Sequence, residues 1–336
     1  MATVDVTVMG AGIFGLSVAY ACACRGAKVR VVDPHGVAAG ASGGLVGALA
    51  PHVPENWNEK KAFQFESLIM AQDFWASVEH LTGVDVGYQR SGRLQPLTDD
   101  HAVALARARA ATAKELWQGK AVWKILESGD DAWMPPSPTG LVVYDTLSAL
   151  IHPRRATRAL AAAVAKKGGE VVGHGPEQGA VVWATGWSGM TEIGGNGVKG
   201  QAALLRYDAS GKPQLFADAL HIIPHGDGTV AVGSTSERDF DDPSGTDAGL
   251  DHILTRAIGA FPVLCGAEVI ERWAGVRPRA KSRAPVLGHH PIRAGQFIAN
   301  GGFKIGFGMA PKVGAVMADL ILEGRDTVPA GFKPMP

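Results

Sequence analysis

The pattern of apolar and polar positions divides the chain into segments with different periods. At its start, a valine-rich segment over 4–9 leads into a glycine-rich turn at 10–15 and then into a helical stretch. A second valine-rich segment over 29–32 follows and ends in Asp33. Short apolar runs bounded by turn residues are typical of buried strands. Residues 4–33 therefore predict a strand, a glycine turn, a helix and a second strand.

Helical periodicity recurs further along the chain. Apolar side chains spaced by three and four positions predict helices over 59–81, 100–127, 154–167 and 313–322. The third of these is rich in alanine, and two glycines end it. Residues 301–311 contain several glycines and a proline, so we expect turns there.

The strand patterns are of two kinds. A strand is expected to begin at 170, and a buried strand over 179–184 ends in a glycine turn. Residues 200–235 alternate apolar and polar positions and are interrupted by Asp-Gly turns, which predicts antiparallel sheet. Residues 34–52 are too rich in glycine and small side chains for a stable amphipathic helix, and we expect their backbone to lie against a flat or charged ligand.

Nucleotide-binding patterns at both ends of the chain, with antiparallel sheet between them, predict two interleaved domains. The fold class is α/β, with a Rossmann-type dinucleotide-binding domain and a substrate domain built on an antiparallel β-sheet. The first domain is assigned to 1–53, 145–203 and 275–336, and the second to 54–144 and 204–274.

Composition narrows the class of protein. The chain has 336 residues, enough for two domains, and its 32 Lys and Arg balance its 32 Asp and Glu. No overall field attracts nucleic acid, so no nucleic-acid partner is expected. The three cysteines lack metal or disulfide spacing and read as free thiols. Neither a leader nor a membrane span is recognised, so we expect a cytoplasmic protein.

The first unit carries the clearest chemistry. Gly10 allows the tight turn, Gly12 lets a pyrophosphate approach the backbone, and Gly15 lets helix and strand pack closely. The helix N-terminus offers free N–H groups to a diphosphate. Asp33 is positioned for a ribose hydroxyl pair and repels a 2′-phosphate, which disfavours NADP. Asp33 also argues against the alternative of an ordinary glycine-rich turn.

Four motifs occur in order along nearly the whole chain. They are the fingerprint over 10–33, the small-residue segment 42–52, the strand end Ala184–Ser188, and the segment 273–288 with its continuation 301–311. Together they resemble the FAD-dependent amino-acid and amine oxidoreductases of the D-amino-acid oxidase family. Within that family the chain is most similar to the glycine oxidases of thiamine biosynthesis.

The resemblance implies a non-covalent FAD, because no cysteine lies in the flavin-facing motifs. It places the loop 302–306 against the flavin pyrimidine ring, the backbone of 48–50 near the reactive side, and the adenine near Val172. The implied cofactor residues are Gly10, Gly12, Ile13, Phe14, Gly15, Asp33, Pro34, Ala41, Ser42, Gly43, Gly47, Ala48, Leu49, Val172, Ala184, Thr185, Gly186, Trp187, Gly302, Phe303, Lys304, Ile305 and Gly306.

Three residues are assigned to the substrate by the same resemblance. Arg277 matches the arginine that pairs with the substrate carboxylate, and a guanidinium can hold a carboxylate through two hydrogen bonds. Lys304 stands where glycine oxidases often have arginine, and His221 stands where a tyrosine often lines the pocket. A structural arginine and an ordinary strand histidine are the alternatives for Arg277 and His221. The segment 172–181 is shorter than is usual in the family.

The resulting hypothesis is oxidation of a small amino acid or N-substituted glycine by FAD. The α-carbon gives a hydride to the flavin, and the imine hydrolyses to an oxo acid and an amine. Oxygen, a quinone or another carrier accepts the electrons. Alternatives are a D-amino-acid dehydrogenase, a tRNA wobble-uridine flavoprotein, which segment 41–51 resembles but the neutral charge disfavours, and a non-enzymatic dinucleotide-binding protein. No metal is expected, and a homo-oligomer is possible.

Overall fold

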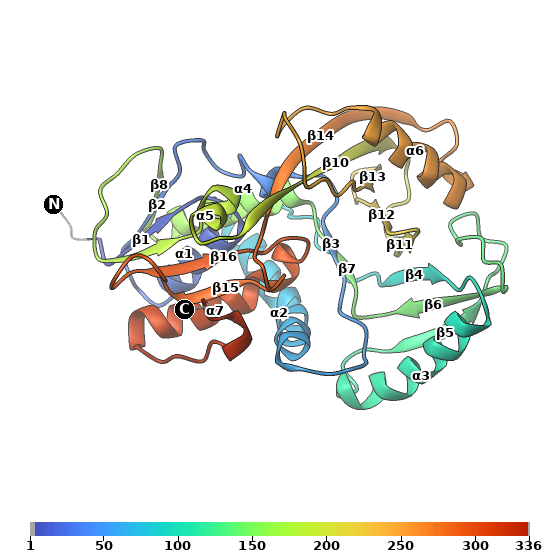
Figure 1. Cartoon of the computed structure of the whole chain (residues 1–336), viewed down its shortest axis with the longest axis horizontal. Coiled ribbons are helices and arrows are strands. Elements are labelled where there is room, and N and C mark those ends of the chain that lie inside the picture. Colours follow the sequence, from blue (N-terminus) through green and yellow to red (C-terminus); the bar gives the residue numbers. More distant parts are fainter. Residues whose placement is uncertain (1–3, 335–336) are drawn as a thin grey trace.

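Residues 4–334 are described in a computed structural model, and most of their strands belong to two large sheets (Figure 1). A six-stranded sheet lies at the N-terminal end of the molecule, and an eight-stranded sheet lies at the other end. Two long strands, β10 (Asn196–Arg206) and β14 (Glu268–Arg279), run from the first half into the second. The predicted fold class is confirmed.

The six-stranded sheet has the order β15-β16-β9-β1-β2-β8. Its central strands β1 (Val6–Met9), β2 (Val29–Val32) and β9 (Ala180–Trp183) are parallel and largely buried. Strands β8 (Glu170–Val172) and β16 (Phe297–Asn300) extend it in parallel, while β15 (Val286–His289) is antiparallel. Parallel strands covered on both faces are rich in apolar residues, and β1 and β2 are mostly valine, interrupted by Thr7 and Arg30.

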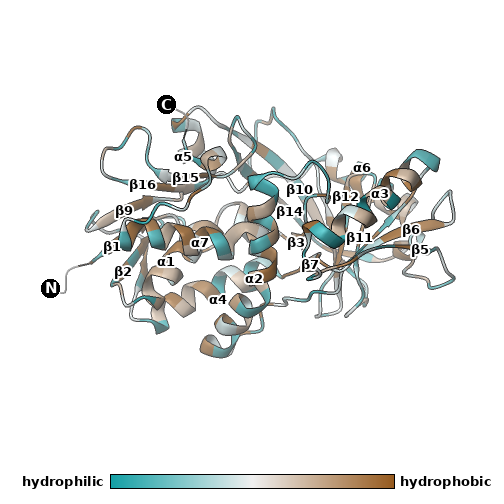
Figure 2. Ribbon diagram, turned by 90° about the horizontal axis from the view of Figure 1, so that it is seen from below, coloured by the Kyte–Doolittle hydropathy of each residue, from teal (hydrophilic) through white to brown (hydrophobic). Residues whose placement is uncertain are grey.

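Four helices pack together on this sheet. They are α1 (Ile13–Cys24), α2 (Glu59–Thr82), α4 (Pro153–Lys166) and α7 (Gly306–Glu323). Figure 2 shows them side by side, with apolar residues prominent on α1 and α7. The α1–α7 contact is close, because a Cβ at Gly314 would lie 2.6 Å from the carbonyl oxygen of Ser17.

The eight-stranded sheet has the order β14-β10-β13-β12-β11-β4-β6-β5. Its other strands are β4 (Arg93–Pro96), β5 (Trp123–Glu127), β6 (Leu141–Asp145), β11 (Gln214–Ala217), β12 (Leu220–Pro224) and β13 (Thr229–Gly233). Every pairing is antiparallel except β4 with β11. Helices α3 (Asp100–Leu116) and α6 (Ala248–Ala260) cover it. The remaining pieces are α5 (Gly186–Glu192), the ribbon of β3 (Ala48–Leu49) with β7 (Ala149–Leu150), and short 3-10 turns at 41–43, 262–264 and 330–332.

Two predicted boundaries are wrong. The helix expected over 100–127 ends at Leu116, and 123–127 is strand β5, because a turn with positive φ at Gln118 and Gly119 separates the two. The last helix begins at Gly306 rather than at 313 and contains Pro311. Glycine and proline have low helix propensity, so the local sequence did not predict a helix over 306–312. Packing of α7 against α1 and α2 overrides this low propensity.

The predicted domain division stays a prediction. All strands of the six-stranded sheet fall in the ranges assigned to the dinucleotide-binding domain, of which residues 1–3 and 335–336 lie outside the described residues. Strands β10 and β14 cross the expected boundaries at 203 and 275. Among the helices of residues 4–334, none combines the length and apolar character that crossing a bilayer requires.

Candidate active site

A cavity of about 820 Å³ lies where the two sheets meet. One side is formed by the carboxyl ends of β1, β2, β9 and β16 and the loops after them, and the other by residues of β10, β11, β12 and β14. Ligands of parallel α/β sheets bind at the carboxyl ends of the strands, and pockets for organic ligands usually measure roughly 300–1,000 Å³. This cavity is therefore the candidate site.

At one end of the cavity, Asp33 is held in a fixed orientation. Its Oδ2 accepts a hydrogen bond from the backbone N–H of Ala11 at 2.8 Å, and its Oδ1 accepts one from the N–H of His35 at 3.0 Å. The first bond joins the turn after β1 to the end of β2, and the second lies within the turn that follows β2. Each carboxylate oxygen can accept further hydrogen bonds, so Asp33 remains able to bind hydroxyl groups.

The N-terminus of α1 lies beside Asp33. Its first N–H, from Ile13, donates to Oγ of Ser42 at 2.9 Å. The next N–H groups of a helix have no carbonyl partner within it, and Phe14 also lines the cavity. A negatively charged group placed here would meet both these donors and the positive end of the helix dipole.

The wall of the cavity suits a long, flat cofactor with a diphosphate. Glycines at 12, 40, 44, 47, 186, 302 and 306 line it, so backbone rather than side chains faces the space. Gly47 has φ +67°, and a Cβ there would lie 1.8 Å from the carbonyl oxygen of Ile151. Asp33, the helix N-terminus and the glycine-lined wall follow each other along one cavity, which fits FAD.

Most of the predicted cofactor residues line this cavity. They are Gly10, Gly12, Ile13, Phe14, Asp33, Pro34, Ala41, Ser42, Gly47, Ala48, Ala184, Thr185, Gly186, Trp187, Gly302, Phe303, Lys304, Ile305 and Gly306. Their individual contacts with the cofactor stay predictions.

Four predicted residues do not line the cavity: Gly15, Gly43, Leu49 and Val172. A Cβ at Gly15 would lie 2.0 Å from the carbonyl oxygen of Gly10, so this glycine allows the close helix–strand packing that the fingerprint predicts. Leu49 is fully buried in the core. The carbonyl of Val172 does not face the cavity. It accepts a hydrogen bond from the N–H of Asp33 at 3.0 Å and so helps to hold the backbone of Asp33 in place.

At the other end of the cavity, Arg277 projects from β14. Its Nη2 donates to Oγ of Ser234 at 2.6 Å, and its Nη1 donates to the carbonyl of Thr235 at 3.3 Å. Burial lowers the pKa of Arg277 to about 10, so the guanidinium stays charged at neutral pH. Both partners are neutral, and Arg277 forms no ion pair with a carboxylate of residues 4–334. Its charge is available to a ligand.

Lys304 lies near Arg277. Partial loss of surrounding water, and then the charge of Arg277, lower the pKa of Lys304. The side chain is exposed in the open cavity, and Nζ lies 5.8 Å from the ring centre of Phe303. Within the described part of the chain, no carboxylate forms an ion pair with it. Lys304 is thus a second cation of the cavity without a partner of opposite charge.

His221 lies on β12 among the cations. Burial is the main reason that its pKa is lowered to about 3, and the charges of Arg93, Lys304 and Arg277 lower it further. The ring is therefore neutral at physiological pH. Its Nδ1 is buried and has no hydrogen-bond partner among residues 4–334. The sequence reading placed His221 in the pocket, and the structure brings it together with Arg277 and Lys304.

Arg93 of β4 completes the group and was not found by sequence reasoning. Its Nε donates to Oδ2 of Asp145 at 3.1 Å, and its Cζ lies 5.6 Å from the ring centre of Phe216. The ring of Phe216 also contacts that of His221, with centres 4.7 Å apart. No local motif surrounds Arg93. The parallel pairing of β4 with β11 brings it beside Phe216.

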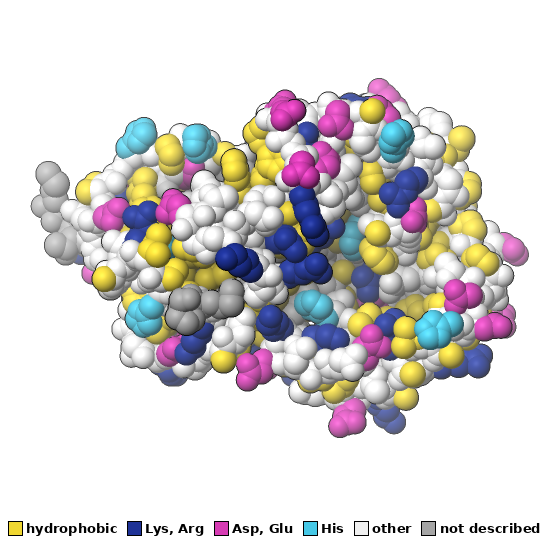
Figure 3. Space-filling model, viewed as in Figure 1, with side chains coloured by type: hydrophobic (Ala, Val, Ile, Leu, Met, Phe, Trp, Pro, Cys, Tyr) yellow, Lys and Arg dark blue, Asp and Glu magenta, His cyan; other side chains and the backbone are white. Residues whose placement is uncertain are grey.

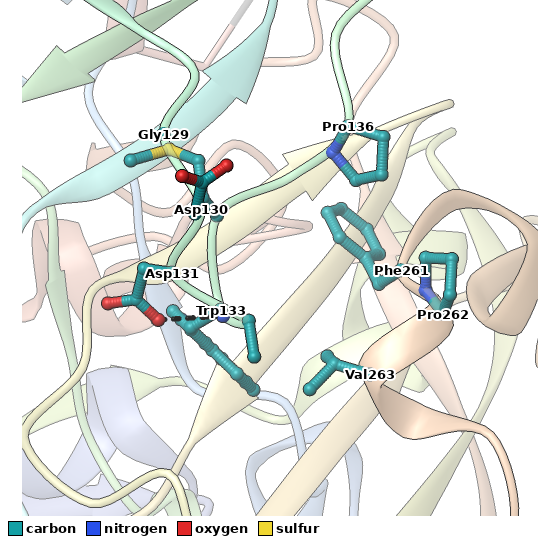
Figure 4. Close-up of a pocket in the computed structure, with 10 residues that line it drawn as sticks. Gly129, Asp130, Asp131, Trp133, Pro136, Phe261, Pro262 and Val263 are labelled. Atoms are coloured by element: carbon teal, nitrogen blue, oxygen red, sulfur yellow. Dashed lines mark hydrogen bonds between the residues drawn. The ribbon is translucent and has the colours of Figure 1, made fainter.

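A second, smaller pocket lies between the loop after β5 and the residues that follow α6 (Figure 4). It measures about 320 Å³ and is lined by apolar residues of 132–136 and 261–263 with Asp130 and Asp131. Asp131 accepts the N–H of Trp133 at 2.9 Å and pairs with Lys212 at 2.8 Å. These contacts occupy Asp131. No cluster of His, Cys, Asp or Glu in the described residues is arranged to hold a metal ion.

Comparison with known proteins gives a consistent result. The family profile described as DAO, FAD dependent oxidoreductase, matches residues 5–320. The bifunctional protein ThiO/ThiG of Trichormus variabilis is 28% identical over 362 residues, covering 96% of this chain and 53% of that protein. A glycine oxidase of Pseudomonas putida is 28% identical over 370 residues, covering 98% of each.

The similarity extends to solved structures. The crystal structure of glycine oxidase from Geobacillus kaustophilus superposes with a TM-score of 0.85 at 21% identity, covering 98% of both chains. At that identity the likeness concerns the fold. The chain spans about half the length of the first curated relatives it matches, the bifunctional proteins.

Proposed function

Because the chain belongs to the DAO family of FAD-dependent oxidoreductases, we propose that it oxidises a small amino acid or an N-substituted glycine with a non-covalently bound FAD. The observation that carries the proposal is Arg277, a charged guanidinium without a carboxylate partner in the described chain, in the same cavity as the dinucleotide-type turn. The names of the relatives, glycine oxidases among them, support this substrate class.

Arg277 binds the substrate carboxylate in this proposal. Two N–H groups of one guanidinium can hold both carboxylate oxygens and so orient the α-carbon. Ser234 and Thr235 accept hydrogen bonds from the guanidinium and so fix its orientation. Fixing the reacting atom close to its partner supplies much of the rate enhancement in such reactions.

The cations of the cavity also act on the substrate amine. The charges that lower the pKa of His221 disfavour any further positive charge beside them. A substrate ammonium bound here would therefore lose its proton more readily than in water. The neutral amine has the lone pair that supports loss of a hydride from the α-carbon, so no dedicated general base is needed.

FAD supplies the hydride acceptor when bound. Asp33 would hold its ribose and the N-terminus of α1 its diphosphate. The product imine hydrolyses to an oxo acid and an amine, and the electrons pass to oxygen or to another carrier.

The test is anaerobic addition of glycine, sarcosine and short D-amino acids to the purified protein. Loss of the visible flavin absorbance, with an oxo acid formed in equal amount, would support the proposal. A flavin that none of these compounds reduces would contradict it. Repeating the reaction with oxygen or with a quinone then identifies the electron acceptor.

A further inference from the structure

The substrate end of the cavity carries more positive charge than one carboxylate requires. Arg93, Arg277 and Lys304 all line it, and no carboxylate of residues 4–334 does, since Asp33 lies at the opposite end. Figure 3 shows Lys and Arg side chains gathered in the hollow near the middle of the molecule. All three cations are near enough to His221 to lower its pKa.

The nearby acids do not cancel this charge. Asp145 is fully buried and pairs with Arg93, so it neutralises that residue alone. The charge of Glu237 raises the pKa of Arg277, but Glu237 forms its ion pair with the buried Lys199, whose Nζ lies 3.7 Å from Oε2 of Glu237. Arg277 and Lys304 are left as two cations without an ion-pair partner in residues 4–334. A single substrate carboxylate balances only one of them.

The donors divide into two groups. Ser234 and Thr235 hold the guanidinium of Arg277 at β14. Arg93 and His221 lie on either side of Phe216, on β4 and β12. His221 adds a buried Nδ1 that has no partner among the described residues and that donates a hydrogen bond in one neutral tautomer.

We propose that the preferred substrate carries two acidic groups, an α-carboxylate bound by Arg277 and a second carboxylate bound by Lys304 with Arg93 and His221. The substrate class is then an acidic amino acid or an N-carboxyalkyl amino acid. This inference rests on the proposed function, since the α-carboxylate and the amine are those of the oxidised substrate.

Binding of acids that cannot be oxidised tests the inference without turnover. The holoprotein is titrated with succinate and with succinamate, and with malonate and malonamate, at constant ionic strength. Each pair differs in one charge at nearly constant shape. For at least one pair we expect the diacid to bind about tenfold tighter or more, the effect of one additional charge-assisted hydrogen bond. Equal affinity within both pairs overturns the inference.

Variants locate the second subsite. Lys304→Gln should remove most of the advantage of the diacid over its monoamide, because this exposed side chain can be changed without disturbing the core. Lys281→Gln removes an exposed lysine that does not line the cavity and should keep the advantage. Arg93→Lys retains a charge opposite the buried Asp145 and should reduce the advantage partly. An advantage that survives Lys304→Gln unchanged contradicts the assignment.

Turnover separates this inference from the proposed function. Aspartate is compared with asparagine as D-enantiomers, and N-(carboxymethyl)glycine with its monoamide, by the rate of anaerobic flavin reduction. If the diacids reduce the flavin faster than their monoamides at low concentration, the result supports both the proposed function and the second carboxylate subsite. Reduction by monocarboxylates alone refutes the second subsite and keeps the proposed function. Tight diacid binding without reduction by any amine refutes the proposed function and keeps the anionic subsite.

Discussion

The guanidinium of Arg277 lies directly against the backbone of Gly200, so that a Cβ at residue 200 would stand 1.8 Å from Nη2. The two residues belong to the paired strands β14 and β10. Only glycine leaves room for the guanidinium in this position. Gly200 therefore positions Arg277, the residue that we propose binds the substrate carboxylate.

Gly200→Ala should displace Arg277 and impair substrate binding. The added methyl group must move the guanidinium away from Ser234 and Thr235, so we expect KM to rise by about tenfold or more. The measurement is steady-state kinetics with the best amino acid. Gly259→Ala is the matched control, since a Cβ there meets no atom within 4 Å. Unchanged kinetics in Gly200→Ala would contradict the positioning role.

Arg277→Lys should lower catalytic efficiency far more than stability. Lysine keeps the charge but cannot form two parallel hydrogen bonds to a carboxylate. Loss of this contact costs about 2–3 kcal/mol, or roughly a hundredfold in kcat/KM. Kinetics and thermal unfolding of the same preparation provide the check. A lower Tm with unchanged kcat/KM would show that Arg277 is structural.

Asp33→Asn should weaken FAD binding while the fold persists. Asparagine retains one oxygen for the N–H groups of Ala11 and His35, but it lacks the second acceptor and the charge that suits ribose hydroxyls. We expect flavin to be lost on dialysis, as measured by the ratio of flavin to protein absorbance. Asp5→Asn serves as control, because Asp5 bonds the N–H of Lys28 and does not line the cavity. Equal flavin retention in both variants would refute the ribose role.

The dinucleotide end of the site was readable from the sequence because its residues are close along the chain. Gly10, Gly12 and Asp33 belong to one βαβ unit, whose spacing alone brings them together. Arg277 and Lys304 were assigned to the substrate through the resemblance of motifs in the last quarter of the chain, and both line the cavity. The βαβ spacing and these motifs are local, so no knowledge of the sheet order was needed.

The rest of the substrate end depends on contacts across the sheet. Arg93 reaches the cavity through the pairing of β4 with β11, and Gly200 meets Arg277 through the pairing of β10 with β14. No local pattern encodes either pairing. The misjudged start of α7 has a similar cause, because tertiary packing stabilises a segment whose glycines and proline disfavour a helix.

The neutral His221 should make the protein less stable in acid. Its pKa is about 3 in the folded protein and 6.5 for an ordinary histidine, so below pH 6.5 the unfolded chain takes up a proton that the folded chain does not. The stabilisation is complete above pH 6.5 and declines as the pH falls toward 3, by up to about 1 kcal/mol per pH unit.

His221→Gln keeps a polar side chain of similar size and cannot titrate. Denaturant unfolding from pH 7 to pH 4 should therefore show a shallower loss of stability in this variant. His174→Gln, which replaces an exposed histidine, should follow the wild-type curve. Identical slopes for the wild type and His221→Gln would mean that His221 is protonated in the folded state, and the cations around it would then be too weak to depress the pKa of a bound substrate amine.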